Sequence, residues 1–359
     1  MRIAQLAPLI EAVPPAGYGG IELVASNLTE QLVERGHEVT LFASGDSQTG
    51  ARLVPVVERS LRHCGHVKPH MWPAFDCRAL LMLESMQDQF DIVHNHMGWQ
   101  ALPTVAKLRV PVVTTNHNNI ERETRAIYEA HKHQPYVAIS HAYKRLNLGD
   151  EVNYVDVIYN GINFERFQYD RFSKRTYLLF IGRLCHDKGT ADAIKLALRL
   201  NLPLKLAGKV DSTDVAYFKT EIEPLLQNPL LEYVGEVNEQ EKVNLLRGAI
   251  ALTYPIAFEE PFGLVMVESL ACGVPVLAFD RGAVREILQD QSTAIVGNTV
   301  EELARRFPEI ATISREYCRD QVQNRFSAAQ MTDRYEAVYE QLLGRAADPE
   351  HQSLSSLHI

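Results

Sequence analysis

The sequence of 359 residues has few cysteines, no long apolar run and no excess of positive charge. Five cysteines with no close pair among them indicate no disulfide framework and a reducing compartment, so we expect a cytoplasmic protein. No apolar run approaches the length that spans a bilayer, so we expect at most a peripheral membrane contact. The net charge of −9 argues against a nucleic-acid partner, because a phosphate backbone requires a basic surface.

The length and the alternation of elements indicate two domains. A short apolar strand at 2–6, a glycine-containing loop, a helix and a strand at 37–43 open the chain as a Rossmann-like unit does. After a polar segment at 163–175, an apolar strand at 177–181 starts the same alternation again. The sequence therefore predicts an α/β fold with two Rossmann-like domains.

The most informative stretch runs from Tyr254 to Asp280. Glu260 comes directly before Pro261, and Glu268 follows eight residues after Glu260 within an apolar run. Proline suits the first position of a helix, so the pattern predicts a helix from Pro261 with Glu268 about two turns inside. The free N–H groups at such a helix start favour an anion, best a phosphate. On spacing alone, a helix with an N-terminal acid and a salt-bridged interior Glu explains the pattern equally well.

Glu260 and Glu268, with the intervening PFGLVMV, resemble the Glu-x7-Glu motif of the retaining glycosyltransferases of family 4, which have the GT-B fold. Similarity to this family spans about residues 1 to 343. It implies two Rossmann-like domains that face each other across a cleft, with a C-terminal helix that crosses back to the first domain. We expect an acceptor-side domain over 1–165, a nucleotide-sugar-binding domain over 166–325, the crossing helix over 326–344 and a disordered tail over 345–359.

Two cations precede one predicted helix of the second domain. Arg183 follows the strand at 177–181, and Lys188 comes five residues after Arg183. Two fixed positive charges suit a diphosphate leaving group, although ordinary surface cations are the alternative. The resemblance implies that Arg183 and Lys188 bind the diphosphate. It also implies donor-binding roles for Glu260 (sugar hydroxyls), Glu268 (ribose hydroxyls) and the helix start at Phe262, Gly263, Leu264 and Val265.

Two glycines follow the first strand and allow the backbone to approach a ligand. Pro14 and Pro15 separate Gly19 and Gly20 from that strand, and the G-x-G-x-x-G register of dinucleotide-binding proteins is absent. A dinucleotide site is therefore a weak alternative, and a plain turn is another. The resemblance implies that Gly19 and Gly20 contact the donor phosphate or the acceptor.

Histidines lie at the ends of two predicted strands of the first domain. His94 and His96 follow Asp91 in a pattern similar to the family's Asp-x-x-His-x-His, and the strand at 110–117 ends in His117. Ligands of open α/β sheets bind beyond the carboxyl ends of strands, where a histidine can donate to a sugar or move protons near it. The resemblance implies that His117 contacts the donor sugar. His94 and His96 are expected to be structural or to face the acceptor, with His96 on the acceptor side.

We therefore expect a retaining hexosyltransferase that moves a sugar from a nucleotide diphosphate donor to a hydroxyl of a saccharide, lipid or small molecule. A UDP-sugar is favoured over a GDP-sugar, and the donor is a substrate, so no cofactor is expected. The chain has no Asp-x-Asp pair, which predicts metal independence and no metal site. The catalytic candidates are His117, Glu260, Arg183 and Lys188.

The resemblance implies a same-face attack guided by the leaving phosphate, and not a covalent intermediate on Glu260. Two other classes of protein fit parts of the pattern. One is a nucleotide-sugar epimerase on the same fold, and the other is a non-catalytic protein that binds a sugar nucleotide. Arg183 and Lys188, with both glutamates present, count against the non-catalytic alternative.

Overall fold

The computed structural model describes residues 1–347, which form two compact units. Unit 1 comprises Met1–Pro15, Gly19–Gly161 and the segment from Ala328, and unit 2 comprises Ala16–Tyr18 and Ile162–Ser327. Apart from residues 16–18, the chain passes from unit 1 to unit 2 at residues 161–162 and returns to unit 1 at residues 327–328. The sequence predicted these domain boundaries at 165–166 and 325–326. The expected disordered tail lies, from residue 348, outside the described residues.

Unit 1 is built on one seven-stranded sheet in which every pair of neighbouring strands is parallel. The strand order reverses between the first and fourth strands, as in doubly wound folds. Parallel sheets of this kind are covered on both faces, which explains why a strand such as β5 (Val112–Asn116) is buried at every position. In spatial order the strands are β3 (Arg52–Val57), β2 (Glu38–Ser44), β1 (Arg2–Leu6), β4 (Ile92–Asn95), β5 (Val112–Asn116), β6 (Tyr136–Ala138) and β7 (Tyr154–Val157).

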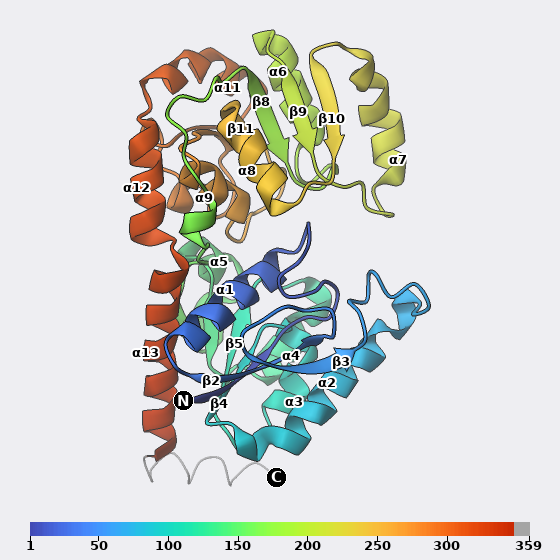
Figure 1. The fold of residues 1–359 in the computed structure, drawn as a ribbon, viewed down its shortest axis with the longest axis vertical. Helices are drawn as coiled ribbons and strands as arrows, with labels where there is room; N and C mark the ends of the chain where they lie inside the picture. The colour runs from blue at the N-terminus through green and yellow to red at the C-terminus, as the bar shows by residue number, and fades with distance from the viewer. Residues whose placement is uncertain (348–359) are drawn as a thin grey trace. The chain divides into compact units, whose positions relative to one another are not determined.

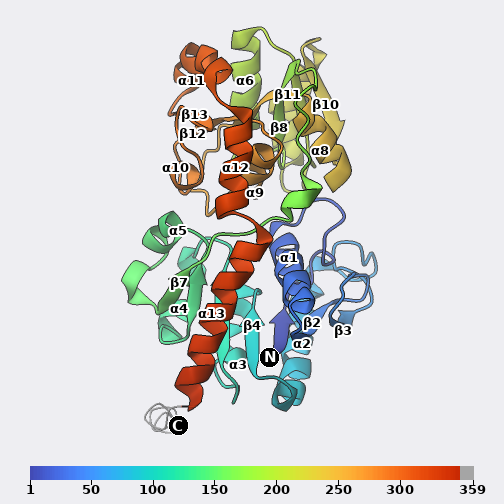
Figure 2. The same cartoon turned by 60° about the vertical axis from the view of Figure 1, so that its left-hand side comes forward.

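The last helix that the structure describes belongs to unit 1. Figure 2 shows α13 (Ala328–Ala347) lying beside α1 (Gly20–Glu34). Arg35, at the end of α1, binds Asp333 of α13 at 2.7 Å. The apolar spacing on α13 buries Met331, Tyr335, Val338, Tyr339 and Leu342. The other α-helices of unit 1 are α2 (Trp72–Met86), α3 (Leu102–Val105), α4 (Arg122–Ala130) and α5 (His141–Leu146).

Unit 2 repeats the architecture with six parallel strands, whose order reverses between β8 and β11. Figure 1 shows β8, β9 and β10 side by side in this unit. In spatial order the strands are β10 (Leu231–Gly235), β9 (Leu204–Ala207), β8 (Tyr177–Ile181), β11 (Ala249–Tyr254), β12 (Val276–Phe279) and β13 (Ala294–Gly297). The helices are α6 (Thr190–Leu200), α7 (Val215–Tyr217), α8 (Glu239–Arg247), α9 (Leu264–Ala271), α10 (Val284–Ile287), α11 (Val300–Arg306) and α12 (Arg315–Arg325).

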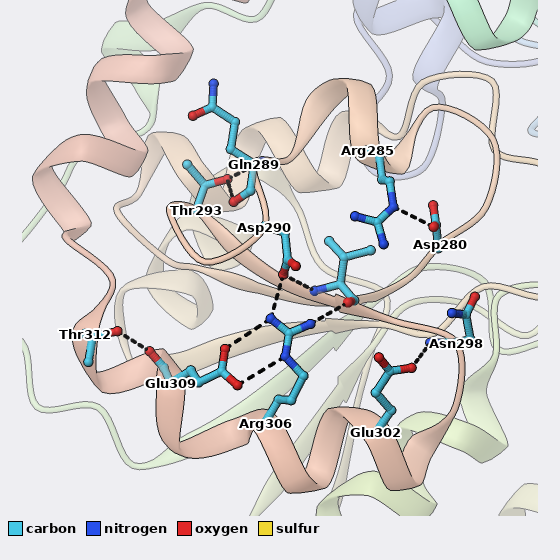
Figure 3. A network of polar contacts seen from close by, with 11 residues as sticks. Asp280, Arg285, Gln289, Asp290, Thr293, Asn298, Glu302, Arg306, Glu309 and Thr312 are labelled. Atoms are coloured by element: carbon cyan, nitrogen blue, oxygen red, sulfur yellow. Dashed lines mark hydrogen bonds and ion pairs between the residues drawn. The ribbon is translucent and has the colours of Figure 1, made fainter.

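The edge strand β13 is fixed to α11 by one arginine (Figure 3). Arg306 donates to the Val296 carbonyl of β13 at 2.8 Å and binds Asp290 and Glu309, each at 3.0 Å. The two carboxylates raise the pKa of Arg306 above its ordinary value, so the guanidinium stays charged. A bidentate contact to Glu309 fixes the planar group, which single surface ion pairs seldom achieve.

The prediction of two Rossmann-like α/β domains is confirmed. The strand β3, at the edge of the sheet, contains Pro55. A proline is tolerated in a sheet chiefly at such an edge. All five cysteines are free. In residues 1–347, no helix combines the length and the hydropathy needed to cross a membrane.

Candidate active site

The predicted site residues of each unit lie beyond the carboxyl ends of strands. Doubly wound sheets bind ligands at these ends, close to the point where the strand order reverses. In unit 2, Arg183 and Lys188 follow β8, and Glu260 follows β11, the two strands between which the order reverses. In unit 1, His96 follows β4 and His117 follows β5. The topology thus brings the candidates within each unit to one edge of the sheet.

Lys188 and Glu260 meet in unit 2. Lys188 Nζ lies 3.2 Å from Glu260 Oε2 and 4.6 Å from the centre of the Phe258 ring. The Tyr254 hydroxyl donates to the same carboxylate oxygen. Burial, with the nearby Glu260 charge, raises the pKa of Tyr254 well above its ordinary value, so this hydroxyl stays a donor. Glu260 is only 7% exposed, and two donors therefore hold it in place.

A glycine allows Lys188 to reach this position. Gly189 has φ +72, and a Cβ there would come within 1.8 Å of the Pro255 carbonyl oxygen. Only a residue without a side chain lets the loop after β8 contact the loop after β11 so closely. The sequence gives no sign of this contact, because Pro255 is distant from Gly189 along the chain.

The start of α9 differs from the prediction. Pro261 does not begin the helix, which runs from Leu264 to Ala271 with Gly263 as its N-cap. Gly263 has φ +85, which is a left-handed backbone conformation. Because an α-helix cannot run through such a residue, α9 cannot extend back to Pro261. The first-turn N–H groups, at the partly exposed Leu264 and Val265, have no acceptor within the helix. These N–H groups and the helix dipole favour an anion. Phe262, which precedes Gly263, is buried.

Glu268 is the fifth residue of α9, so it lies about one turn inside the helix and not two. It is 3% exposed, and Lys242 of α8 binds it at 2.5 Å. Arg183 in turn binds Asp214 at 3.3 Å. The sequence pointed to neither Lys242 nor Asp214, since no local pattern connects them with their partners. In these two ion pairs, the charges of Glu268 and Asp214 are each compensated by a cation.

The histidines of unit 1 form a chain of hydrogen bonds. His117 Nε2 lies 3.0 Å from His96 Nδ1, and His96 Nε2 lies 2.9 Å from Gln5 Oε1. Gln5 Nε2 donates to the Tyr339 hydroxyl at 3.3 Å. That hydroxyl lies 2.7 Å from His94 Nδ1. The chain therefore links His117 to α13 through strands β1 and β4.

The donors and acceptors of this chain fix the position of each proton. The Gln5 carbonyl oxygen accepts, so His96 carries its proton on Nε2 and accepts at Nδ1. His117 must then donate from Nε2, which leaves its Nδ1 as an acceptor. Burial lowers the pKa of His117 to about 3 and that of His96 well below its usual range. His117 thus offers a neutral acceptor and not a proton.

His94 has a structural position. Burial lowers its pKa well below the ordinary value, and its Nε2 lies 2.7 Å from Thr115 Oγ1. Thr115 in turn contacts the Tyr335 hydroxyl at 2.9 Å. With the Tyr339 contact at its other nitrogen, His94 has both ring nitrogens occupied. The importance of Tyr335 and Tyr339 was not predicted, because their spacing on α13 looks like ordinary apolar packing.

The glycine loop lies at the start of α1. Gly19 is the N-cap and Gly20 the first residue of this helix. A side chain on Gly19 would clash with Pro15, at 2.7 Å from its Cβ, and would lie 3.2 Å from Glu22 Oε2. Glu22 is 5% exposed, and burial, with the charge of Glu11, raises its pKa to about 7. The sequence did not single out this carboxylate.

Two parallel-sheet Rossmann-like units match the architecture of GT-B glycosyltransferases. Residues 18–166 match the family model described as Glycosyltransferase Family 4. Residues 161–326 match the model described as Glycosyl transferases group 1. The two matches follow one another along the chain and support a glycosyltransferase of the family 4 type.

Relatives agree with this assignment. The chain is 26% identical to an uncharacterised glycosyltransferase of Methanocaldococcus jannaschii over 328 residues, which cover 79% of this chain and 82% of the relative. The sucrose-phosphate synthase of Thermosynechococcus elongatus has a similar structure, with a TM-score of 0.80, 17% identity and coverage of 96% and 99%. HepE of Anabaena, in complex with UDP-glucose, has a similar structure with a TM-score of 0.74 and 16% identity. The match covers 95% of this chain and 100% of HepE. The two structures show a shared fold. The epimerase and non-catalytic alternatives are not favoured.

Proposed function

We propose that this protein transfers a sugar from a nucleotide diphosphate donor to an acceptor hydroxyl, with retention of the anomeric configuration. The observation that carries the proposal is the Lys188–Glu260 pair at the switch point of unit 2, beside the start of α9. A cation, a carboxylate and free N–H groups at one sheet edge match the two halves of a nucleotide sugar. The cation and the N–H groups suit the diphosphate, and the carboxylate suits sugar hydroxyls.

In the proposed reaction the bond between the anomeric carbon and the diphosphate oxygen breaks, and a bond from that carbon to the acceptor oxygen forms. The electron pair of the broken bond stays on the diphosphate, where Lys188, Arg183 and the first-turn N–H groups of α9 stabilise the growing negative charge. The acceptor's proton passes to an oxygen of the departing phosphate. Because that oxygen lies on the face that the acceptor attacks, the configuration is retained without a covalent enzyme intermediate.

The remaining candidates hold the substrate. Glu260 would accept hydrogen bonds from hydroxyls of the transferred sugar, and Glu268 from the ribose. His117 would accept from a sugar hydroxyl at its Nδ1, in the tautomer that the hydrogen-bond chain sets. Gly19 and Gly20 would let the backbone approach the donor phosphate or the acceptor, and His96 would act on the acceptor side by positioning His117.

A UDP-sugar is the proposed donor, since HepE, of the same fold, was solved with UDP-glucose. The fixed cations Arg183 and Lys188 could neutralise the diphosphate in the way a metal ion does elsewhere, and we propose a metal-independent reaction without a further cofactor. The acceptor hydroxyl would belong to a saccharide, a lipid or a small molecule. Free cysteines favour a reducing, cytoplasmic location.

The test has two stages. Thermal shifts with UDP, GDP and ADP identify the base, and UDP should raise the melting temperature most. The protein is then incubated with the UDP-sugar that binds, with and without a panel of acceptors, while UDP release and the anomeric proton of the product are followed by NMR. We expect UDP release that depends on the acceptor, and a product with the donor's anomeric configuration. An altered nucleotide sugar formed without acceptor would indicate an epimerase, and binding without turnover a non-catalytic protein.

A further inference from the structure

Unit 2 contains a pocket of about 520 Å³ at the amino ends of its strands. Its lining includes Arg175, which precedes β8, Leu202, which precedes β9, and Ile250 at the start of β11. Arg183, by contrast, follows the carboxyl end of β8. This strand has five residues, so its first and last residues are about 13 Å apart at roughly 3.3 Å per residue. The pocket is therefore separate from the candidate active site.

The charges that face this pocket do not balance. Arg171, Arg175 and Arg315 line it, with Glu316 as the acid among the lining residues. Three positive charges against one negative charge leave an excess of two. Glu316 is already engaged, because it accepts from the Tyr169 hydroxyl at 3.1 Å and lies 3.8 Å from Arg171. Within the described part of the chain, no carboxylate forms an ion pair with Arg175 or Arg315.

The two unpaired guanidinium groups are held by neutral acceptors. Arg175 donates to the carbonyl oxygens of Asp170 at 2.8 Å and Ser173 at 3.1 Å, and its buried Nε has no partner among the described residues. Arg315 donates to two backbone carbonyls, at 3.0 and 2.9 Å. Burial and the charge of Arg175 lower the pKa of Arg315 to about 10. Both guanidinium groups are thus held in place with no carboxylate in residues 1–347 to neutralise them, and an anion would relieve their mutual repulsion.

The start of a helix adds to the positive potential. Ser314 and Arg315, both in the lining, are the N-cap and first residue of the eleven-residue helix α12. The positive end of the helix dipole therefore points at the same pocket. Phe307, Ile310 and Ile313 supply apolar lining beside these charges. A phosphate ester carries between about 1.5 and 2 negative charges near neutral pH, which matches the excess of two.

We infer that this pocket is a second anion site, which binds a phosphate monoester through Arg171, Arg175 and Arg315. The ester can come from two sources. A soluble phosphorylated metabolite fits the pocket alone. The monoester headgroup of phosphatidic acid fits the neighbouring loop as well, because Phe172 is 93% exposed between Arg171 and Lys174. An exposed ring flanked by cations is typical of a segment that contacts an anionic membrane surface.

The soluble source is tested by calorimetric titration of the whole chain with inorganic phosphate. Arg175→Gln should raise the dissociation constant for phosphate about 10-fold or more, as expected for losing a charged hydrogen-bond partner. Arg171→Gln is the second variant, because this exposed side chain does not anchor backbone carbonyls. Arg199→Gln should leave the constant within about twofold. Arg199 is a matched control, since it is exposed on α6 and pairs with Glu301 at 3.4 Å.

The lipid source is tested by flotation with phosphatidylcholine vesicles that contain or lack phosphatidic acid. Flotation that requires phosphatidic acid and is lost in Phe172→Ser and Arg175→Gln would assign the ester to a lipid. Phosphate binding without flotation would assign it to a soluble metabolite. No binding in either arm, or binding that survives both arginine substitutions, would overturn the inference. So would phosphate binding lost only in Lys188→Ala. None of these measurements requires sugar transfer, so the result is independent of the proposed function.

Discussion

The two units present different chemistry at equivalent edges of their sheets. In unit 1 the polar side chains at the strand ends are neutral and joined by hydrogen bonds, from His117 through His96 and Gln5 to Tyr339. In unit 2 the polar side chains at the strand ends are charged, and Lys188 forms an ion pair with Glu260. A shared topology therefore supplies positions for side chains but does not determine their charge.

The difference shows what each arrangement is suited to. A neutral, fully hydrogen-bonded cluster can be buried without the large desolvation cost of ions. A buried ion pair such as Glu268–Lys242 is weak evidence for stability, because apolar residues of the same size often stabilise as well or better. Under the proposed function, the charges of unit 2 serve ligand binding, and the histidine chain of unit 1 orients a neutral acceptor.

The largest effect is expected when one charge of the buried pair in unit 2 is removed. Lys242→Met leaves Glu268 buried without its cation, which should lower the free energy of unfolding by about 3–5 kcal/mol in urea denaturation. The double variant with Glu268→Leu should recover most of this loss. Lys205→Met is the control, because its partner Glu232 is exposed and the change should stay below about 1 kcal/mol. Equal losses for both lysines would contradict the comparison.

The next effect concerns turnover. Lys188→Ala should lower kcat about 10²–10³-fold, as the loss of one donor to a developing oxyanion does elsewhere. The matched control is Lys195→Ala, an exposed lysine of the neighbouring helix that pairs with Asp192. Circular dichroism should show both variants folded. Unchanged turnover in Lys188→Ala would remove this residue from the site.

An ionised group buried in unit 1 should lower the free energy of unfolding, whereas the neutral histidine chain should not. The pKa of Glu22 is raised from its ordinary 4.5 to about 7, so the folded state binds more protons than the unfolded state between these values. Stability contributed by the protonated form is present below pH 4.5 and is lost as the pH rises to about 7. At about 1.4 kcal/mol per pKa unit, Glu22→Gln should therefore stabilise the protein by about 3 kcal/mol at pH 8. Melting curves at pH 8 and pH 5 check this, with little difference expected at the lower pH.

The smallest effect is expected from one hydroxyl of the neutral chain. Tyr339→Phe removes the hydrogen-bond partner of His94 Nδ1 and of Gln5 Nε2, which should cost about 1–3 kcal/mol of unfolding free energy. ¹⁵N chemical shifts should show His117 protonated on Nε2 in the wild type and a mixture of tautomers in the variant. Tyr335→Phe is the control, since its hydroxyl contacts Thr115 at the far end of the chain. An unchanged tautomer in Tyr339→Phe would show that His117 is oriented independently of α13.

The sequence predicted the features that depend on local order. Strand and helix alternate with the expected period, and Glu260 and Glu268 could be found because they lie close together in the chain. The partners could not be found. Gln5 and Tyr339 are 334 residues apart, and Lys242 and Glu268 lie on different helices, so only the folded chain brings them together. The start of α9 was misplaced because the rule for proline at a helix start carries no information on the left-handed Gly263.

The membership of α13 in unit 1 has a consequence for the order in which the protein matures. Translation releases the chain from its amino end, so β1 and β4 leave the ribosome long before Tyr335 and Tyr339 are made. Apart from the three residues 16–18, all of unit 2 is synthesised in the interval. Gln5 and His94 therefore lack their contacts with Tyr339 until α13 emerges. Unit 1 starts before unit 2 along the described chain, yet it is completed after unit 2.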